Sequence, residues 1–418
     1  MTTAQKVLEA WTKFAELSDP THSDPMAVEL LRSPAEHAEL IEQALEHIRL
    51  VDKHEGSLLG SLGYDFLFTS SLWRRGNEAV LQARAMQQVL CWVHRHPADN
   101  GCFPNIVARH TFEANFLYSA PRLRQWDGIN FLLMPYVYQE LLLLPAAALF
   151  QTLCVAAPLT APWGFLDAPL PTASFAGTTP CSLRKLIARV ITSNAFDPSM
   201  DGENPVAYLS RDSEWFVGID DEASEPSSLE DVLAYSGQDF AIAHEIGHCA
   251  TESIKLPYLE AEALADRVGM GLFATSWGWR DEVLDSCPLG QGARIFLGPI
   301  WFFFTARLLY KLRGILANRI SASFSCDLSF LLGEADDAEH LATLAARWSH
   351  VASYLSQYAQ EIEGQVGVLS ELDVHRVDGL VSTLSSFDEA MPTWVASIPD
   401  ECLFKAIKLV DPSVSFKR

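Results

Sequence analysis

The sequence predicts a mainly helical α+β protein. Apolar residues recur at helical spacing along most of the chain, one short segment has the composition of paired strands, and a proline-rich segment interrupts both patterns. With 418 residues and 49% apolar side chains, the chain can build a large core. We therefore predict a helical region over residues 1–157, a proline-rich linker over 158–180, a core over 181–320 and a helical C-terminal region over 321–418.

The N-terminal region repeats its apolar residues at helical spacing over residues 7–15, 40–48 and 80–93, which indicates amphipathic helices. Residues 141–157 are almost continuously apolar and approach the length needed to cross a bilayer. Pro145 interrupts this segment, and no basic residue nearby would set its orientation in a membrane. We interpret it as a buried helix, with a membrane anchor as the open alternative.

Prolines crowd the segment 158–180 and end the helical pattern, because each one fixes φ and removes a backbone donor. Residues 206–219 then carry the clearest strand signature, two runs rich in aromatic and β-branched residues on either side of a polar turn. We predict a β-hairpin there. Helical spacing predicts further helices over residues 182–191, 229–252, 258–276, 292–318 and 337–363, followed by a less regular tail.

The chain carries 53 acidic and 30 basic side chains, which gives a formal net charge of −23. Nucleic acids and anionic membrane surfaces require a cationic patch, and no Lys/Arg-rich run provides one, so neither class of partner is expected. The 8 cysteines form no CxxC pair, which argues against a disulfide framework or a cysteine-built zinc site. The N-terminus lacks the continuous apolar stretch of a signal peptide. We therefore expect a cytoplasmic protein.

The motif that carries chemistry is His244-Glu245-Ile-Gly-His248. Residues four apart on a helix project from one face, so both imidazoles can bind a single metal ion. Glu245 lies about 100° round the helix from His244. Its carboxylate therefore stands beside the metal, where it can take a proton from water. Imidazole nitrogen is a good zinc ligand, and three protein ligands leave a fourth position open, so the motif predicts a hydrolytic zinc site.

A second predicted helix, downstream of the motif, offers the third ligand. Glu262 follows His248 by fourteen residues, and Asp266 lies one turn further along. Glu262 can complete a tetrahedral site, and Asp266 can accept the free ring N–H of a ligating histidine. Glu260 competes with Glu262 as the ligand, but Leu264 and not a carboxylate stands four residues after it. We therefore prefer Glu262.

These residues resemble a known family. His244-Glu-Ile-Gly-His248 followed by Glu262-Ala-Leu-Ala-Asp266 is similar to the HExxH…ExxAD pattern of gluzincin metallopeptidases, which include prenyl-protein and heat-shock membrane proteases and the ImmA-type soluble proteases. The resemblance implies a zincin-like core over residues 181–320, with zinc on His244, His248 and Glu262. It also implies that Glu245 is the general base and Asp266 the carboxylate that supports a ligand.

The resemblance also implies a strand that faces the substrate, and the predicted hairpin 206–219 is the candidate. Trp215, Phe216 and Val217 would then bind an extended peptide along an exposed edge. An ordinary structural hairpin is the alternative. The spacing of residues does not identify the group that would stabilise the transition state. Several side chains could donate a hydrogen bond to the developing oxyanion: Tyr258, Arg307, Tyr310, His340, His350 and His375.

Two functional hypotheses follow. The first is a zinc-dependent metallopeptidase that hydrolyses a peptide bond in a specific protein or peptide, with Glu245 as the base. The second is a non-proteolytic binding or regulatory protein in which zinc staples two helices. Acidic residues crowd the segment 220–231 just before the metal-binding motif, which predicts a preference for basic substrate segments.

Overall fold

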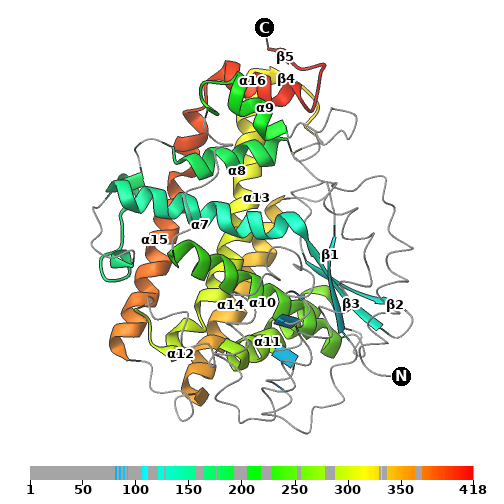
Figure 1. Ribbon diagram of the computed structural model, residues 1–418, viewed down its shortest axis with the longest axis vertical. Coiled ribbons are helices and arrows are strands. Elements are labelled where there is room, and N and C mark those ends of the chain that lie inside the picture. Colours follow the sequence, from blue (N-terminus) through cyan, green and yellow to red (C-terminus); the bar gives the residue numbers. More distant parts are fainter. Residues whose placement is uncertain are drawn as a thin grey trace, which may run out of the picture.

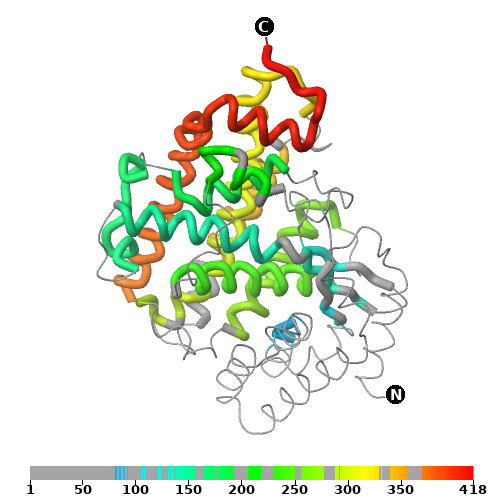
Figure 2. Tube along the Cα trace, turned by 45° about the horizontal axis from the view of Figure 1, so that its top comes forward, coloured from blue at the N-terminus to red at the C-terminus, as the bar shows by residue number. Residues whose placement is uncertain are grey.

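The computed structural model is mainly helical and carries two small sheets. It describes residues 106–111, 121–126, 129–156, 163–192 except 176 and 178, 205–217, 228–251, 256–277, 288–328, 331, 337–362 and 370–417, with scattered helical positions between 81 and 92. The helices predicted over residues 7–15 and 40–48 lie outside this part of the chain. Figures 1 and 2 show the C-terminus at one end of the molecule and the larger sheet at one side.

The larger sheet contains β1 (Ile106–Thr111), β2 (Arg122–Trp126) and β3 (Ile129–Pro135). Its order is β1-β3-β2, with β1 parallel and β2 antiparallel to the central β3, so β2 lies at an edge. These strands correct the prediction that residues 1–157 are helical throughout. Short apolar runs do not distinguish a strand from a helix by periodicity, and the overlooked signal was Asp127-Gly128, which is typical of a tight hairpin turn.

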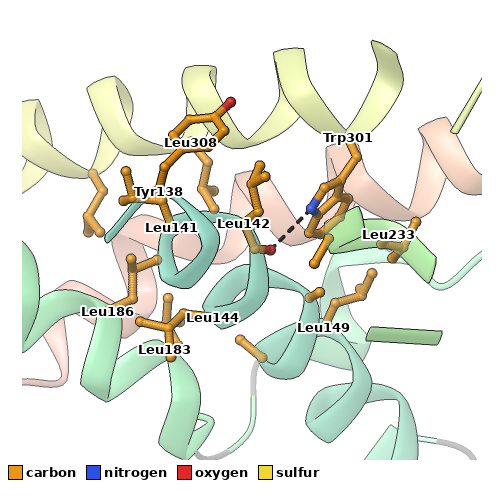
Figure 3. Packing of buried hydrophobic residues seen from close by; sticks show 14 of the residues in the cluster. Tyr138, Leu141, Leu142, Leu144, Leu149, Leu183, Leu186, Leu233, Trp301 and Leu308 are labelled. Carbon is orange, nitrogen blue, oxygen red and sulfur yellow. Dashed lines mark hydrogen bonds between the residues drawn. The ribbon is translucent and has the colours of Figure 1, made fainter. Parts of the chain in front are cut away.

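Helix α7 (Tyr136–Ala156) follows β3 directly and crosses the centre of the molecule. Its leucines pack against α8 (Cys181–Ile191) and α13 (Leu297–Ser323), and the Trp301 indole donates a hydrogen bond to the Leu142 carbonyl over 3.1 Å (Figure 3). In the part of the chain that is described, Tyr138–Val155 and Gly292–Ser323 are long and apolar enough to span a membrane. These windows are 61% and 56% buried inside the protein, which is also what core helices show.

The predicted hairpin 206–219 is wrong. Residues Pro205–Asp212 form helix α9, and residues 214–217 form a turn, while 218 and 219 lie outside the described residues. Val206 and Leu209 are fully buried three residues apart on α9, and Phe216 is fully buried in the turn that follows. Pro205 occupies the first helical position, where its missing N–H costs nothing. The aromatic and β-branched composition was therefore outweighed by packing on one side of a helix.

The proline-rich segment packs into the core where it is described. It forms two short 3-10 turns, η4 (Gly164–Leu166) and η5 (Thr172–Phe175), which contact α15 (Glu371–Ala396). Phe175 meets the rings of Phe387 and Trp394 edge-on. The remaining C-terminal elements are α12 (Gln291–Arg294), α14 (Asp337–Ile362), α16 (Asp400–Lys408) and the short strands β4 (Phe324–Ser325) and β5 (Ser415–Phe416).

The predicted helices 229–252 and 258–276 are confirmed as α10 (Ser228–Thr251) and α11 (Tyr258–Trp277). The two helices cross very closely because glycines stand at their contact. A Cβ on Gly247 would lie 2.4 Å from the Ala265 carbonyl oxygen, and one on Gly269 would lie 2.8 Å from the His244 backbone. This close approach brings the motif on α10 next to the carboxylates on α11.

Gly247→Ala is expected to lower the free energy of unfolding by about 1–3 kcal/mol, because the new methyl group would push against backbone atoms that cannot rotate away. Gly314→Ala is the matched control. Gly314 also lies inside a helix, α13, but an added Cβ there meets nothing within 4 Å, so helix propensity predicts a gain of up to about 1 kcal/mol. Urea denaturation of both variants measures the difference, and equal stabilities would contradict the proposed close crossing.

Candidate metal centre

Helices α10 and α11 bring His244, His248 and Glu262 together, and their ligand atoms all lie within 4.8 Å of one another. Nε2 of His244 is 3.2 Å from Nε2 of His248 and 3.5 Å from Oε2 of Glu262. Nε2 of His248 is 3.4 Å from Oε1 of Glu262. Metal–ligand bonds of about 2.0–2.1 Å in a tetrahedral site give ligand–ligand edges of about 3.3–3.4 Å. The three side chains therefore fit a tetrahedral divalent metal ion.

Asp266 holds the ring of His244 in position. Its Oδ1 lies 2.8 Å from Nδ1 of His244, so the ring donates from Nδ1 and leaves Nε2 free to bind a metal. Asp266 is almost completely buried, on the same face of α11 as Glu262 and one turn further along. Asp266 therefore lies where the sequence analysis expects the carboxylate that accepts the ring N–H of a ligating histidine. The predicted competitor Glu260 is exposed on α11.

Arg347 on α14 is a member of the site that sequence reasoning missed. Its guanidinium donates to both carboxylate oxygens of Asp266, over 2.9 Å from Nε and 2.8 Å from Nη2. Its Nη1 lies 2.9 Å from Oε2 of Glu262. The side chain is 8% exposed and packs over the ring of Phe303. Arg347 therefore neutralises two buried carboxylates while leaving Oε1 of Glu262 directed at His248.

Arg347→Met is expected to lower the free energy of unfolding of the metal-free protein by about 3–5 kcal/mol, because two buried carboxylates lose the cation between them. Added zinc should restore part of that loss, since a divalent ion supplies positive charge at the same carboxylates. Thermal unfolding with and without zinc measures both effects. Arg267→Met is the control, because Arg267 is exposed and lies over the Tyr354 ring. A metal-free Arg347→Met protein as stable as the control variant would contradict this role.

Glu245 stands beside the three ligands without joining them. Its Oε1 is 3.9 Å from Nε2 of His244, and its side chain is buried. The backbone N–H of Leu123, on edge strand β2, donates a hydrogen bond to the Glu245 carboxylate. Burial raises the pKa of Glu245 to about 7, and the nearby Glu262 charge adds to the shift. A carboxylate of that basicity, next to a metal ion, is suited to accept a proton.

The two histidines titrate in opposite directions. Burial opposes the charged form of His244, but the Asp266 and Glu262 carboxylates outweigh it and raise its pKa to about 9. Burial and the charge of His244 together lower the pKa of His248 to about 4. Burial alone would raise the pKa of Asp266, but the charges of His244 and Arg347 lower it to about 2. The negative charge of the site therefore resides on the two α11 carboxylates.

Arg84 also contacts helix α10. It is one of the described helical positions between residues 81 and 92. Arg84 Nε donates to Oδ1 of the fully buried Asp239 over 2.7 Å, and the Gln88 amide donates to the Asp239 carbonyl over 2.8 Å. Asp239 precedes His244 by five residues on α10. These contacts hold α10 against residues far away in the sequence.

Trp215, Phe216 and Val217 lie in the turn after α9, where the Arg184 guanidinium on α8 donates to the Trp215 carbonyl over 2.7 Å. Figure 1 places α8 and α9 near the C-terminus and α11 near the opposite end of the molecule. The basis for their substrate-binding prediction, an edge strand beside the metal, is therefore absent from the described residues 205–217.

Most of the residues whose side chains could stabilise a transition state lie apart from the metal ligands, and Tyr258 is the exception. Arg307 pairs with Asp388 on α15, and Tyr310 stacks on His340. Tyr258 is 67% exposed at the start of α11, and burial of part of its ring and the nearby Glu262 charge raise its pKa. His350 lines a cavity between α11 and α14, and His375 lies on α15.

Comparison with known proteins identifies no homologue. No family model matches the chain, and no curated protein and no solved structure matches it. Any functional assignment therefore rests on the residues and their geometry alone. They establish a buried His/His/Glu group that could hold a metal ion.

Proposed function

We propose that this protein is a zinc-dependent metallopeptidase that hydrolyses a peptide bond in a specific protein or peptide. The observation that carries the proposal is the combination of three ligand atoms at tetrahedral spacing with a buried carboxylate, Glu245, that is next to them and is not a ligand. A purely structural zinc site needs four protein ligands, whereas a catalytic site keeps three and leaves a position open.

Zinc is the metal that best suits this donor set. Two imidazole nitrogens and one carboxylate form a common catalytic zinc site, and they lack the all-oxygen shell that calcium or magnesium prefers. A zinc ion held there would polarise a carbonyl group and make water more acidic. Glu245 then takes the proton from the attacking water and passes it to the leaving amine. Asp266 and Arg347 keep His244 and Glu262 in place during these steps.

The edge strand β2 is better placed to receive a substrate than the residues 215–217. Leu123 pairs with Leu132 of β3, yet its N–H points off the sheet to Glu245, so the outer edge of β2 runs past the base. An extended peptide that added to this edge would bring its backbone next to Glu245 and the metal ligands. Main-chain pairing of this kind suits peptide substrates, which all share the same backbone groups.

The preference for basic substrate segments stays part of this proposal. Of the acidic residues in the segment 220–231, Glu230 and Asp231 lie in the first turn of α10, and Glu230 is buried there. The other four lie outside the described residues. The cytoplasmic location and the exclusion of nucleic acids and membranes rest on the sequence alone.

A search for new peptide termini in cells tests the function and can name the substrate. Cells that express the wild-type protein are compared with cells that express Glu245→Gln at the same level. We expect a small set of new termini that requires Glu245, enriched in basic residues near the cleaved bond. Identical sets of termini in the two cultures would overturn the peptidase assignment.

A further inference from the structure

Tyr138 is a buried phenol whose hydroxyl has no hydrogen bond to any of the described residues. It is 8% exposed and lies in the first turn of α7, directly after the central strand β3. Figure 3 shows its ring rising from α7 toward α13, with the hydroxyl directed away from Leu183 and Leu186 of α8. The hydroxyl oxygen is not fully enclosed, so it can reach water or a bound molecule.

The packing of α7 against α10 places Tyr138 on the side of the metal centre. Gly237 of α10 lies against Leu142 of α7, and Tyr138 is one turn before Leu142. Helix α10 contacts β2 and β3, and Glu245, near its C-terminal end, accepts a hydrogen bond from Leu123 of β2. Because β3 pairs with β2 and leads into the start of α7, the two helices run antiparallel. Glu245 follows Gly237 by two turns and lies about 80° round the helix from it, at the end of α10 that is near Tyr138.

The electrostatic surroundings of Tyr138 agree with this placement. Burial raises its pKa, and the Glu245 charge raises it further, while Arg347 lowers it. The phenol therefore stays protonated and acts as a hydrogen-bond donor. Its charged neighbours are the base and the arginine that holds Glu262 and Asp266, so the hydroxyl faces the same space from the α7 side.

We propose that the Tyr138 hydroxyl donates a hydrogen bond to the oxygen of the scissile carbonyl as negative charge develops on it. This inference rests on the proposed peptidase function. Water adds to the carbonyl carbon, the π electrons move to the carbonyl oxygen, and Glu245 takes the proton that water loses. Tyr138 keeps its own proton throughout. When the carbonyl re-forms and the C–N bond breaks, Glu245 gives the proton to the amine nitrogen.

Tyr138→Phe removes only the hydroxyl and tests the inference. We expect kcat on a peptide found in the search for new termini to fall about 100-fold, with KM changed less than about threefold, because the donor acts in the transition state. Zinc content should be unchanged. The melting temperature should not fall, because the lost group has no partner among the described residues.

Thr305→Val is the control, since it removes one hydroxyl from α13 that is buried and has no hydrogen-bond partner among the described residues. It should keep wild-type kcat. A Tyr138→Phe protein with wild-type kcat would overturn the inference and leave the peptidase assignment standing. A loss of activity accompanied by loss of zinc or a lower melting temperature would also overturn it, because the hydroxyl would then be structural.

A binding measurement separates this inference from the proposed function, because it needs no turnover. Acetohydroxamate is titrated into the cobalt-substituted protein, and the visible spectrum reports binding at the metal. The hydroxamate carbonyl oxygen stands in for the carbonyl oxygen of a substrate. We expect Tyr138→Phe to weaken binding about tenfold and Thr305→Val to leave it unchanged. Equal affinities in all three proteins would refute the role of Tyr138, even if the wild type hydrolysed no peptide.

Discussion

Glu245→Gln is expected to keep zinc and lose turnover. The amide has almost the same shape as the carboxylate, and Glu245 is not one of the three ligands, so zinc content should match the wild type. An amide cannot accept the proton from water, and loss of a general base lowers kcat by roughly 1,000-fold. Purified protein, metal analysis and cleavage of a peptide identified in cells measure the two effects separately.

Two outcomes would contradict this account of Glu245. Unchanged turnover would show that another group accepts the proton. Loss of zinc together with turnover would show that Glu245 helps to hold the ion, so its effect on activity would not reveal a base. Glu260→Gln, on an exposed face of α11, is the control, because it makes the same chemical change at a carboxylate outside the site, and it should keep activity.

Glu262→Gln is expected to weaken zinc binding on the order of 1,000-fold. It removes the anionic ligand that completes the site and also breaks the charged contact with Arg347. Competition with a coloured chelator measures the affinity. Glu260→Gln is the matched control, since it makes the same chemical change two residues earlier on an exposed face of α11, and it should bind zinc as the wild type does.

The outcome of this pair decides between the two carboxylates that the sequence offered as ligands. Weak zinc binding by Glu260→Gln and normal binding by Glu262→Gln would exchange their roles. Normal binding by both would show that zinc is not held on α11, and the tetrahedral arrangement of ligand atoms would then have no function.

The grouping of the candidate metal ligands was largely predictable from sequence because its parts are local. His244 and His248 share a helical face by spacing alone, and Glu262 and Asp266 share another, so two correctly predicted helices bring the four residues within reach. The glycines at positions 247 and 269 that permit the close crossing also stand in the sequence, although their partners Ala265 and His244 appear only in the fold.

The remaining parts of the site depend on contacts between distant segments, which spacing does not reveal. Arg347 lies 81 residues after Asp266, with which it pairs. Leu123 and Tyr138 come from a region predicted to be helical, and only the β1-β3-β2 sheet brings the edge strand to Glu245. The hairpin predicted over 206–219 was wrong because aromatic and β-branched residues favour buried positions as well as paired strands.

X-ray absorption at the zinc edge of the purified, zinc-loaded protein tests the central claim most directly. We predict that zinc is surrounded by two imidazole nitrogens, one carboxylate oxygen and one light atom that the protein does not supply, each about 2.0–2.1 Å from the zinc ion. The Glu262→Gln protein should lose this spectrum, and the Glu260→Gln protein should keep it. A zinc ion surrounded by four protein ligands would contradict the account and favour a structural zinc that staples two helices.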